Sequence, residues 1–299
     1  PRSTRVRSSA ASDVYKRQNM NKIKKIVRQH YLTIIAIILV IIAIYGPISY
    51  YLKEINLISY QKTTDLRVVF FDMSLYQGAY LVFLPPIAVM LIIIDNWYNK
   101  FKNGNIKNYL TRQSYKQFRK NLFLSTAKTA LIYPLILLIF LIVSFIISKS
   151  GNNPVATIEN SLSYSDYNAW AYHHFFLYII RSSLLLYIQG LMVSFFPLIF
   201  LNRIKNKVLL ILFSYITWIV SILLLYAVPY MLLDIYFNYK INNTYLNYYS
   251  FLMYYNLDMN YYLYLFSLSS FTIFLFFINY LLIYNKKEKV VLQNEKEMV

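Results

Sequence analysis

Six long apolar stretches constrain this chain more than any other feature of its sequence. They cover residues 30–50, 76–96, 122–148, 172–201, 208–234 and 261–284. A helix needs about 20 mostly apolar residues to cross the roughly 30 Å hydrocarbon core of a bilayer. Because each stretch meets that length, the sequence predicts an all-α integral membrane protein with a six-helix transmembrane bundle. The composition agrees, since 58% of the residues are hydrophobic and 14% are charged, against about 45–50% and about 25% in soluble domains.

The segments before, between and after these stretches are predicted to lie alternately on the two sides of the membrane. Lysine and arginine are distributed unevenly between the two sides. From Met20 onward, one set of connections carries 19 of these residues and the other set carries 5. Cytoplasmic connections are enriched in Lys and Arg, so both ends of the membrane region are predicted to be cytoplasmic. The net charge of +18 then reflects orientation in the membrane, and no nucleic-acid partner is expected.

The two ends of the chain differ in composition from the region between them. Residues 1–19 hold four arginines, and a basic segment follows Met20 directly. Residues 1–19 are therefore interpreted as a non-native leader, with an Arg- and Ser-rich organelle transit peptide as the alternative. The predicted membrane domain covers 20–285, and 286–299 is predicted to be a charged cytoplasmic tail.

The sequence lacks the motifs of the common enzyme classes. Glycine occurs only at positions 46, 78, 104, 151 and 190, so neither a G-x-x-x-x-G-K-[ST] nor a G-x-G-x-x-G phosphate loop can form. The sequence has no G-x-S-x-G motif, no H-E-x-x-H motif and no cysteine, which argues against hydrolase, zinc and thiol chemistry. No enzyme activity, metal site or bound cofactor is expected for this chain.

The segment 95–122 is the longest and most basic connection on the predicted cytoplasmic side. Its apolar residues recur at helical spacing. They are Tyr98, Phe101, Ile106, Tyr109, Leu110, Tyr115, Phe118 and Leu122. The pattern predicts two short amphipathic helices that place these residues against the membrane or a partner, with lysines facing acidic lipid. A positive-inside loop resting on the membrane surface is the alternative interpretation.

This segment resembles the corresponding loop in the type 2 (export) family of ABC transporter permease subunits. In that loop an acidic residue, a glycine, a leucine, a turn of the Pro-x-Ser-Arg kind and a basic helix follow one another. The residues that match here are Asp95, Gly104, Leu110, Arg112, Ser114 and Lys120. The proline is missing, and Asp95 stands where Glu is commoner. Topology and the segment 235–260, which would suit the family's re-entrant helical pair, extend the resemblance from Met20 to about Asn285.

The resemblance implies a permease that moves an amphipathic substrate, such as a lipid, peptide or antibiotic, by alternating access. A separate cytoplasmic ATPase subunit would bind the ATP, and a second permease copy or paralogue would complete a dimer. The segment from Lys22 to His30 would also contact the ATPase. The implied ATPase-coupling residues are Asp95, Tyr98, Phe101, Gly104, Tyr109, Leu110, Arg112, Ser114, Phe118 and Lys120.

A second interpretation belongs to a different functional class. A non-transporting membrane scaffold or sensor partner would also have a basic cytoplasmic loop, which would bind lipid or a soluble protein. In either case the abundance of Ile, Lys, Asn, Tyr and Phe points to a low-GC bacterium. The expected location is therefore the bacterial plasma membrane.

Arg181 is the one basic residue well inside an apolar stretch. An arginine in hydrocarbon costs at least about 2.5–3.5 kcal/mol on insertion scales, so it must snorkel, pair or face a wet cavity. Ser182 and Gln189 are seven residues apart and share one helix face, which predicts a polar stripe toward the bundle interior. A structural pair between Arg181 and Asp234 is one interpretation, and a role in the transport pathway is the other.

Overall fold

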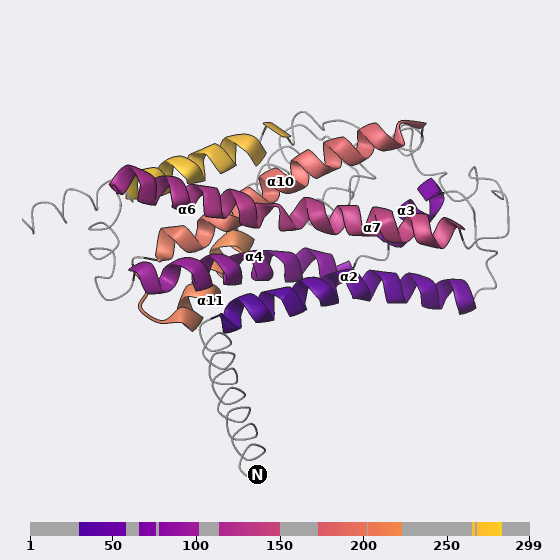
Figure 1. The fold of residues 1–299 in the computed structure, drawn as a ribbon, viewed down its shortest axis with the longest axis horizontal. Helices are drawn as coiled ribbons and strands as arrows, with labels where there is room; N and C mark the ends of the chain where they lie inside the picture. Colours follow the sequence, from indigo (N-terminus) through magenta and orange to yellow (C-terminus); the bar gives the residue numbers. More distant parts are fainter. Residues whose placement is uncertain are drawn as a thin grey trace, which may run out of the picture.

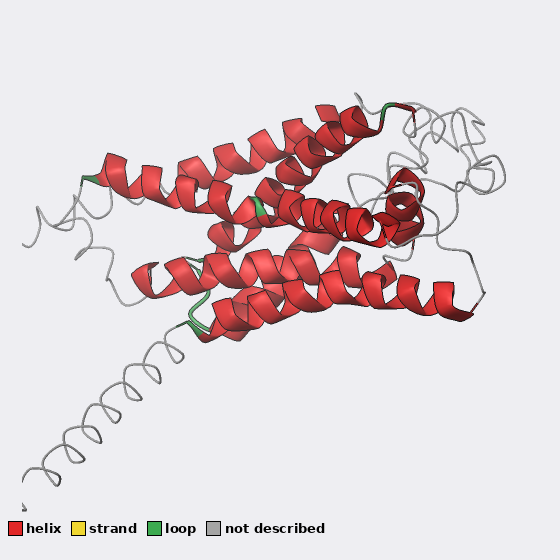
Figure 2. Ribbon diagram, turned by 45° about the vertical axis from the view of Figure 1, so that its right-hand side comes forward, coloured by secondary structure: helices red, strands yellow, loops and turns green. Residues whose placement is uncertain are grey.

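The computed structural model describes residues 30–57, 66–75, 78–101, 114–149, 173–201, 203–222, 265–266 and 268–282. The regular structure in these ranges is helical (Figure 2). The helices are α2 (Tyr31–Leu57), α3 (Leu66–Leu75), α4 (Gly78–Phe101), α6 (Tyr115–Ala130), α7 (Ile132–Lys149), α10 (Phe175–Phe200) and α11 (Lys207–Ile222), with a C-terminal helix over Leu268–Leu282. The longer helices extend side by side along the long axis of the molecule (Figure 1).

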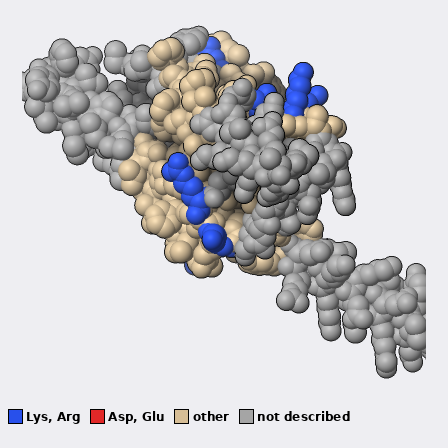
Figure 3. All heavy atoms as spheres, turned by 90° about the vertical axis from the view of Figure 1, so that its left-hand side faces the viewer, with Lys and Arg blue, Asp and Glu red and all other residues tan. Residues whose placement is uncertain are grey.

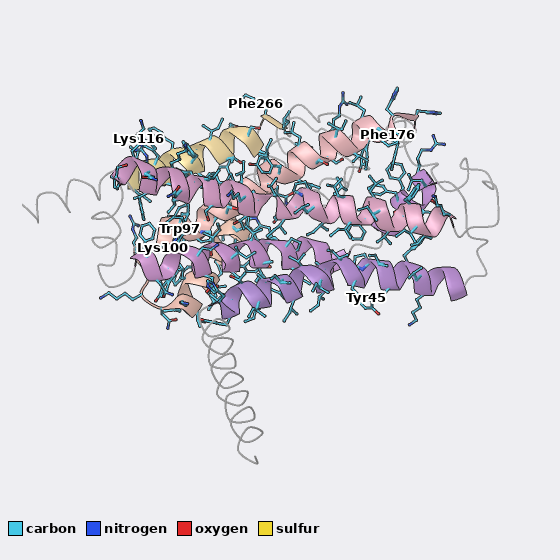
Figure 4. All side chains as sticks on the ribbon, viewed as in Figure 1. Tyr45, Trp97, Lys100, Lys116, Phe176 and Phe266 are labelled. Atoms are coloured by element: carbon cyan, nitrogen blue, oxygen red, sulfur yellow. The ribbon has the colours of Figure 1, made fainter. Side chains whose placement is uncertain are left out.

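Large apolar side chains cover the outside of this bundle. Tyr45, Phe176 and Phe266 are 68%, 73% and 71% exposed and project from the ribbon (Figure 4). A soluble monomer rarely exposes so much apolar surface, whereas acyl chains cover it in a bilayer. Among the described residues, Tyr31–Lys53, Tyr115–Lys149 and Phe175–Phe200 are long and apolar enough to cross a membrane. The chain is therefore a membrane protein, and six spans with cytoplasmic ends stay a prediction.

Buried hydroxyl groups in the bundle bond to the backbone of their own helix. Each of four buried serines and threonines donates to the carbonyl oxygen four residues earlier, over 2.7–2.8 Å. They are Ser144, Ser194, Ser214 and Thr272. Because no water competes in hydrocarbon, this bond satisfies the hydroxyl without help from a neighbouring helix.

The third predicted stretch, 122–148, begins earlier in the structure and contains a break. Its helix starts at Tyr115, where the Ser114 hydroxyl accepts a hydrogen bond from the Gln117 N–H over 3.3 Å. A turn at Leu131 separates α6 from α7. Pro134 accounts for the turn, because proline has no N–H to donate to the carbonyl of the residue four positions earlier.

Ala130 of α6 lies close to the backbone of α10 at Gly190. A Cβ atom added to Gly190 of α10 would lie 2.6 Å from the Ala130 carbonyl oxygen and 3.0 Å from Cδ2 of Tyr133. Thr126 and Ser194, one turn away on the two helices, are also small and buried. Small residues at four-residue spacing let membrane helices pack with their backbones close together.

The sequence did not predict α3, because its ten residues are too few to cross a bilayer. Phe70 and Phe71 of α3 are nevertheless 1% exposed. They pack edge-to-face on Phe175, with ring centroids 5.4 and 5.8 Å apart, and Phe71 also packs on Tyr178 at 5.5 Å. This aromatic cluster fixes α3 against the start of α10.

The remaining predicted stretches correspond to helices with shifted ends. Stretch 30–50 is the first part of α2, stretch 76–96 is most of α4, and stretch 172–201 is α10. The last two stretches correspond to α11 and the C-terminal helix over the parts that the structure describes. The segment 235–260, which would suit the re-entrant helical pair of the type 2 permease family, falls outside the described residues.

Candidate functional site: the basic end of the bundle

Five described segments meet at one end of the bundle, which we name the basic end. They are the start of α2, the last turns of α4, the first turns of α6, the turn between α10 and α11, and the end of the C-terminal helix. The basic residues described there are His30, Lys100, Lys116, Arg119, Lys120, Arg203, Lys205 and Lys207. Figure 3 shows this end, with blue cationic side chains and no red on the visible described surface. The acidic residue described there, Asp95, is buried.

Asp95 joins the end of α4 to the start of α2. Its Oδ2 accepts hydrogen bonds from the Thr33 hydroxyl (2.6 Å) and the Thr33 N–H (3.4 Å), and it lies 3.5 Å from Nδ1 of His30. Thr33 is in the first turn of α2, where backbone N–H groups have no partner within the helix. The carboxylate thus caps a neighbouring helix and complements its positive dipole end. Its Oδ1 is buried without a hydrogen-bond partner among the described residues.

Aromatic side chains join the end of α4 to the start of α6. Phe118 is 1% exposed, and its ring centroid lies 5.6 Å from that of Trp97 and 5.9 Å from that of Phe101. The Trp97 indole N–H donates to the Ser125 hydroxyl over 2.9 Å. These contacts hold together the two helix ends between which residues 102–113 run.

Lys100 extends this arrangement to the surface. Its Nζ lies 3.9 Å from the centroid of the Trp97 ring, a cation–π contact. In Figure 4 both residues lie at the same end as Lys116. Partial burial lowers the pKa of Lys100 below its ordinary value of 10.5.

The turn between α10 and α11 is fastened to the same helix ends. The Tyr98 hydroxyl donates to the backbone carbonyl of Lys205. The Lys207 ammonium lies 5.1 Å from the Tyr31 ring centroid and 5.3 Å from the Tyr98 ring centroid. Asp95 and Tyr98 are three residues apart and share a face of α4. One face of α4 therefore holds both α2 and α11 in place.

The structure describes six of the predicted coupling residues and changes the interpretation of several. Gly104, Tyr109, Leu110 and Arg112 lie outside the described residues. Asp95, Tyr98 and Phe118 are buried in contacts within the chain, and Phe101 is half-buried. Ser114 and Lys120 are exposed.

The expected pair of short amphipathic helices over 95–122 is corrected at its two ends, which belong to longer helices, and its middle, 102–113, lies outside the described residues. Residues 95–101 are the end of α4 and residues 115–122 are the start of α6. The expected placement of their apolar residues against the membrane or a partner is wrong for Tyr98, Phe118 and Leu122, which are buried within the bundle. Helical spacing reveals that a face is apolar, and it does not reveal what covers that face.

Sequence reasoning missed Thr33, Trp97 and Lys207 at this end. Thr33 lies in an otherwise apolar run, so periodicity did not distinguish it. The usable signal was Asp95 itself, because a carboxylate at the end of an apolar stretch needs a donor from a neighbouring helix. Sequence reasoning also missed Asn279, 1% exposed, whose Nδ2 donates to the Phe195 carbonyl oxygen over 3.2 Å and joins the C-terminal helix to α10.

The residues predicted to form an intramembrane polar stripe lie on α10. Ser182 and Gln189 are 2% and 8% exposed, and Arg181 beside them is half-buried. Asp234 lies outside the described residues. The Arg181–Asp234 pair and the stripe's role in a pathway therefore stay predictions.

Substitution of Arg181 checks whether its charge is needed. We expect Arg181→Leu to lower the yield of folded protein in the membrane or its transport activity. The reason is that the groups that contact the guanidinium lose its positive charge and its N–H donors. Arg181→Lys keeps the charge and should be partly tolerated. Size-exclusion chromatography in detergent measures the folded yield. Normal yield and normal activity of Arg181→Leu would contradict a need for the charge.

Two further observations concern metal binding and the relationship of the chain to known proteins. Within the described part of the chain, no three His, Cys, Asp or Glu side chains come together as a metal site would require. Comparison of the chain with protein-family models, with curated proteins and with solved structures finds no match.

Proposed function

We propose that this chain is the transmembrane permease subunit of an ATP-driven ABC exporter. It moves an amphipathic substrate by alternating access, and a separate cytoplasmic ATPase supplies the energy. The observation that carries the proposal is the basic end. There the helix ends are joined to one another by buried contacts, and their solvent-exposed surface carries lysine and arginine side chains. Lys116 and Lys120 are exposed residues in the first two turns of α6.

The contacts at the basic end would transmit a movement of the partner subunit to several helices. A partner that moves residues 102–113 acts on the ends of α4 and α6 together, because Trp97, Phe101 and Phe118 hold them to each other. Asp95 and Tyr98 extend that connection to α2 and to the α10–α11 turn. A movement at this end is thereby conveyed into several long helices at once, which alternating access requires.

The partner must bring the nucleotide site. The sequence cannot form either phosphate-binding loop, so ATP is bound by the ATPase subunit and not by this chain. A second permease copy or paralogue completes the dimer, and the location is a bacterial plasma membrane. The substrate is a lipid, a peptide or an antibiotic.

Charge reversal on α6 tests the proposal. The full chain is expressed with its genomic neighbours, purified in detergent, and assayed for a co-eluting ATPase. We expect Lys116→Glu/Lys120→Glu to reduce co-eluted ATPase activity about tenfold or more, because like charges placed across an interface cost several kcal/mol. Both positions are exposed, so the variant retains the fold.

A matched control reverses two charges at the opposite end of the helices. Lys53→Glu/Lys149→Glu changes exposed residues near the end of α2 and at the end of α7, and it should leave the co-eluted ATPase activity unchanged. If the unaltered chain elutes with no ATPase, the exporter proposal fails and a scaffold or sensor partner replaces it. Equal loss in both variants would show that the α6 face is not the docking surface.

A further inference from the structure

We propose that the turn between α10 and α11 binds the headgroup of an anionic phospholipid. Arg203, Lys205 and Lys207 contact the phosphate, and the acyl chains lie on the exposed apolar side chains of α11 and α2. The inference requires the chain to lie in a membrane, and it does not depend on the proposed export function.

The cations of this turn are concentrated on a fixed backbone. Arg203 and Lys205 are exposed, and Lys207 follows two residues later. The N–H groups of Arg203 and Ile204 donate to the Phe200 carbonyl oxygen over 2.9 and 3.0 Å, and the Tyr98 hydroxyl holds the Lys205 carbonyl. A backbone held from both sides loses little entropy when its side chains bind a ligand.

In the part of the chain that the structure describes, no carboxylate is paired with these cations, which leaves them available to an anion. Lys207 is placed over the Tyr31 and Tyr98 rings, which attract its charge but provide no carboxylate. The acidic residue described at this end, Asp95, is buried and accepts hydrogen bonds from Thr33. Arginine and lysine without an exposed carboxylate nearby are the groups that recognise phosphate.

The exposed apolar side chains that follow the turn identify the anion as a lipid. On α11 they begin directly after Lys207 and continue along one side of the helix. They are Val208, Leu209, Leu212, Phe213 and Ile216, each 46–62% exposed. On α2 they begin at Tyr31 under the Lys207 ammonium and continue through Ile34, Ile35 and Ile38. An acidic protein or a free phosphate would bind the cations and leave the apolar side chains uncovered. A phospholipid has a phosphate for the cations and acyl chains for the apolar side chains.

Lipid titration of the purified full chain tests the inference. The chain in neutral detergent is titrated with phosphatidylglycerol, with phosphatidylcholine of the same acyl chains, and with soluble glycerol 3-phosphate, and bound ligand is counted by native mass spectrometry. We expect phosphatidylglycerol to bind more tightly than phosphatidylcholine. Arg203→Gln/Lys205→Gln should weaken phosphatidylglycerol binding about 30-fold, since each basic residue near an anionic membrane surface contributes about a fivefold preference.

Two further variants separate the lipid site from general charge and from a simple anion site. Lys116→Gln/Lys120→Gln removes the same charge from α6 at the same end and should leave binding nearly unchanged. Val208→Ser/Leu212→Ser keeps the cations, removes exposed apolar contacts, and should weaken phosphatidylglycerol binding several-fold.

Three results would overturn the proposal. They are equal affinity for the two lipids, equal loss in the α6 variant and the turn variant, and glycerol 3-phosphate binding as tight as that of phosphatidylglycerol. All four proteins are first compared by size-exclusion chromatography, so that a folding defect is recognised. Because no ATPase is present, the result is independent of the export proposal.

Discussion

Replacing Asp95 by leucine is expected to lower the free energy of unfolding by about 2–4 kcal/mol. The Thr33 hydroxyl and N–H both donate to Oδ2 of Asp95, and leucine leaves these half-buried donors without that acceptor. The start of α2 also loses the negative charge that complements its dipole. Reversible unfolding in mixed micelles, followed by circular dichroism, measures the loss.

Companion variants distinguish the loss of the Asp95–Thr33 hydrogen bonds from a change in side-chain packing at position 95. Asp95→Asn keeps the shape and one acceptor oxygen, so it should lose about half as much stability. Adding Thr33→Val to Asp95→Leu should cost less than the sum of the single changes, because removing both partners leaves no orphaned hydroxyl. Asn96→Leu, at an exposed neighbour on the same helix, serves as the control and should have little effect. Wild-type stability in Asp95→Leu would show that the contact contributes nothing.

Substitution of Gly190 is the second change with a large expected effect. We expect Gly190→Ala to destabilise the bundle by about 1–3 kcal/mol, even though alanine favours a helix over glycine by up to about 1 kcal/mol. The added Cβ would lie 2.6 Å from the Ala130 carbonyl oxygen. That oxygen belongs to the backbone, so no rotamer change can relieve the clash, and α10 must move away from α6.

Two further variants check whether the effect of Gly190→Ala depends on the size of the added side chain and on its position. Gly190→Leu should cost more than Gly190→Ala and abolish a monodisperse elution peak. Ser194→Ala, on the same face one turn later, removes a hydroxyl that bonds only within its helix in the described structure and should cost less than about 1 kcal/mol. Thermal unfolding in detergent compares the three variants. A Gly190→Ala midpoint equal to that of the unaltered chain would contradict the close approach.

Much of the fold follows from the sequence because a bilayer imposes one length scale. Stretches 30–50, 76–96 and 172–201 each correspond to a long helix, since about 20 apolar residues have few alternatives in hydrocarbon. The hydropathy of stretch 122–148 reveals neither the break at Leu131 nor the early start at Tyr115. They depend on Pro134 within an apolar run and on the Ser114 cap, and hydropathy averages over both. α3 depends on packing against α7 and α2 and on ring contacts with α10, none of which a local pattern contains.

The candidate site could be predicted only in part. The acid at position 95 and the basic connection were visible as residue types at the end of an apolar stretch. Their arrangement was not visible, because Asp95 is paired with Thr33, 62 residues earlier, and Tyr98 with Lys205, 107 residues later. Such pairings are decided by which helices become neighbours, and a single sequence gives no measure of that.

The hydroxyl groups that bond within their own helices have a consequence for movement. Ser144, Ser194, Ser214 and Thr272 face the bundle interior, yet each already has its acceptor four residues earlier. Two helices that meet at such positions can slide past each other without breaking a hydrogen bond between them. These four hydroxyl groups thus add little resistance to repacking, which is opposed instead by the shapes of the side chains and by the hydrogen bonds that do join helices, such as that from Asn279 to the Phe195 carbonyl oxygen.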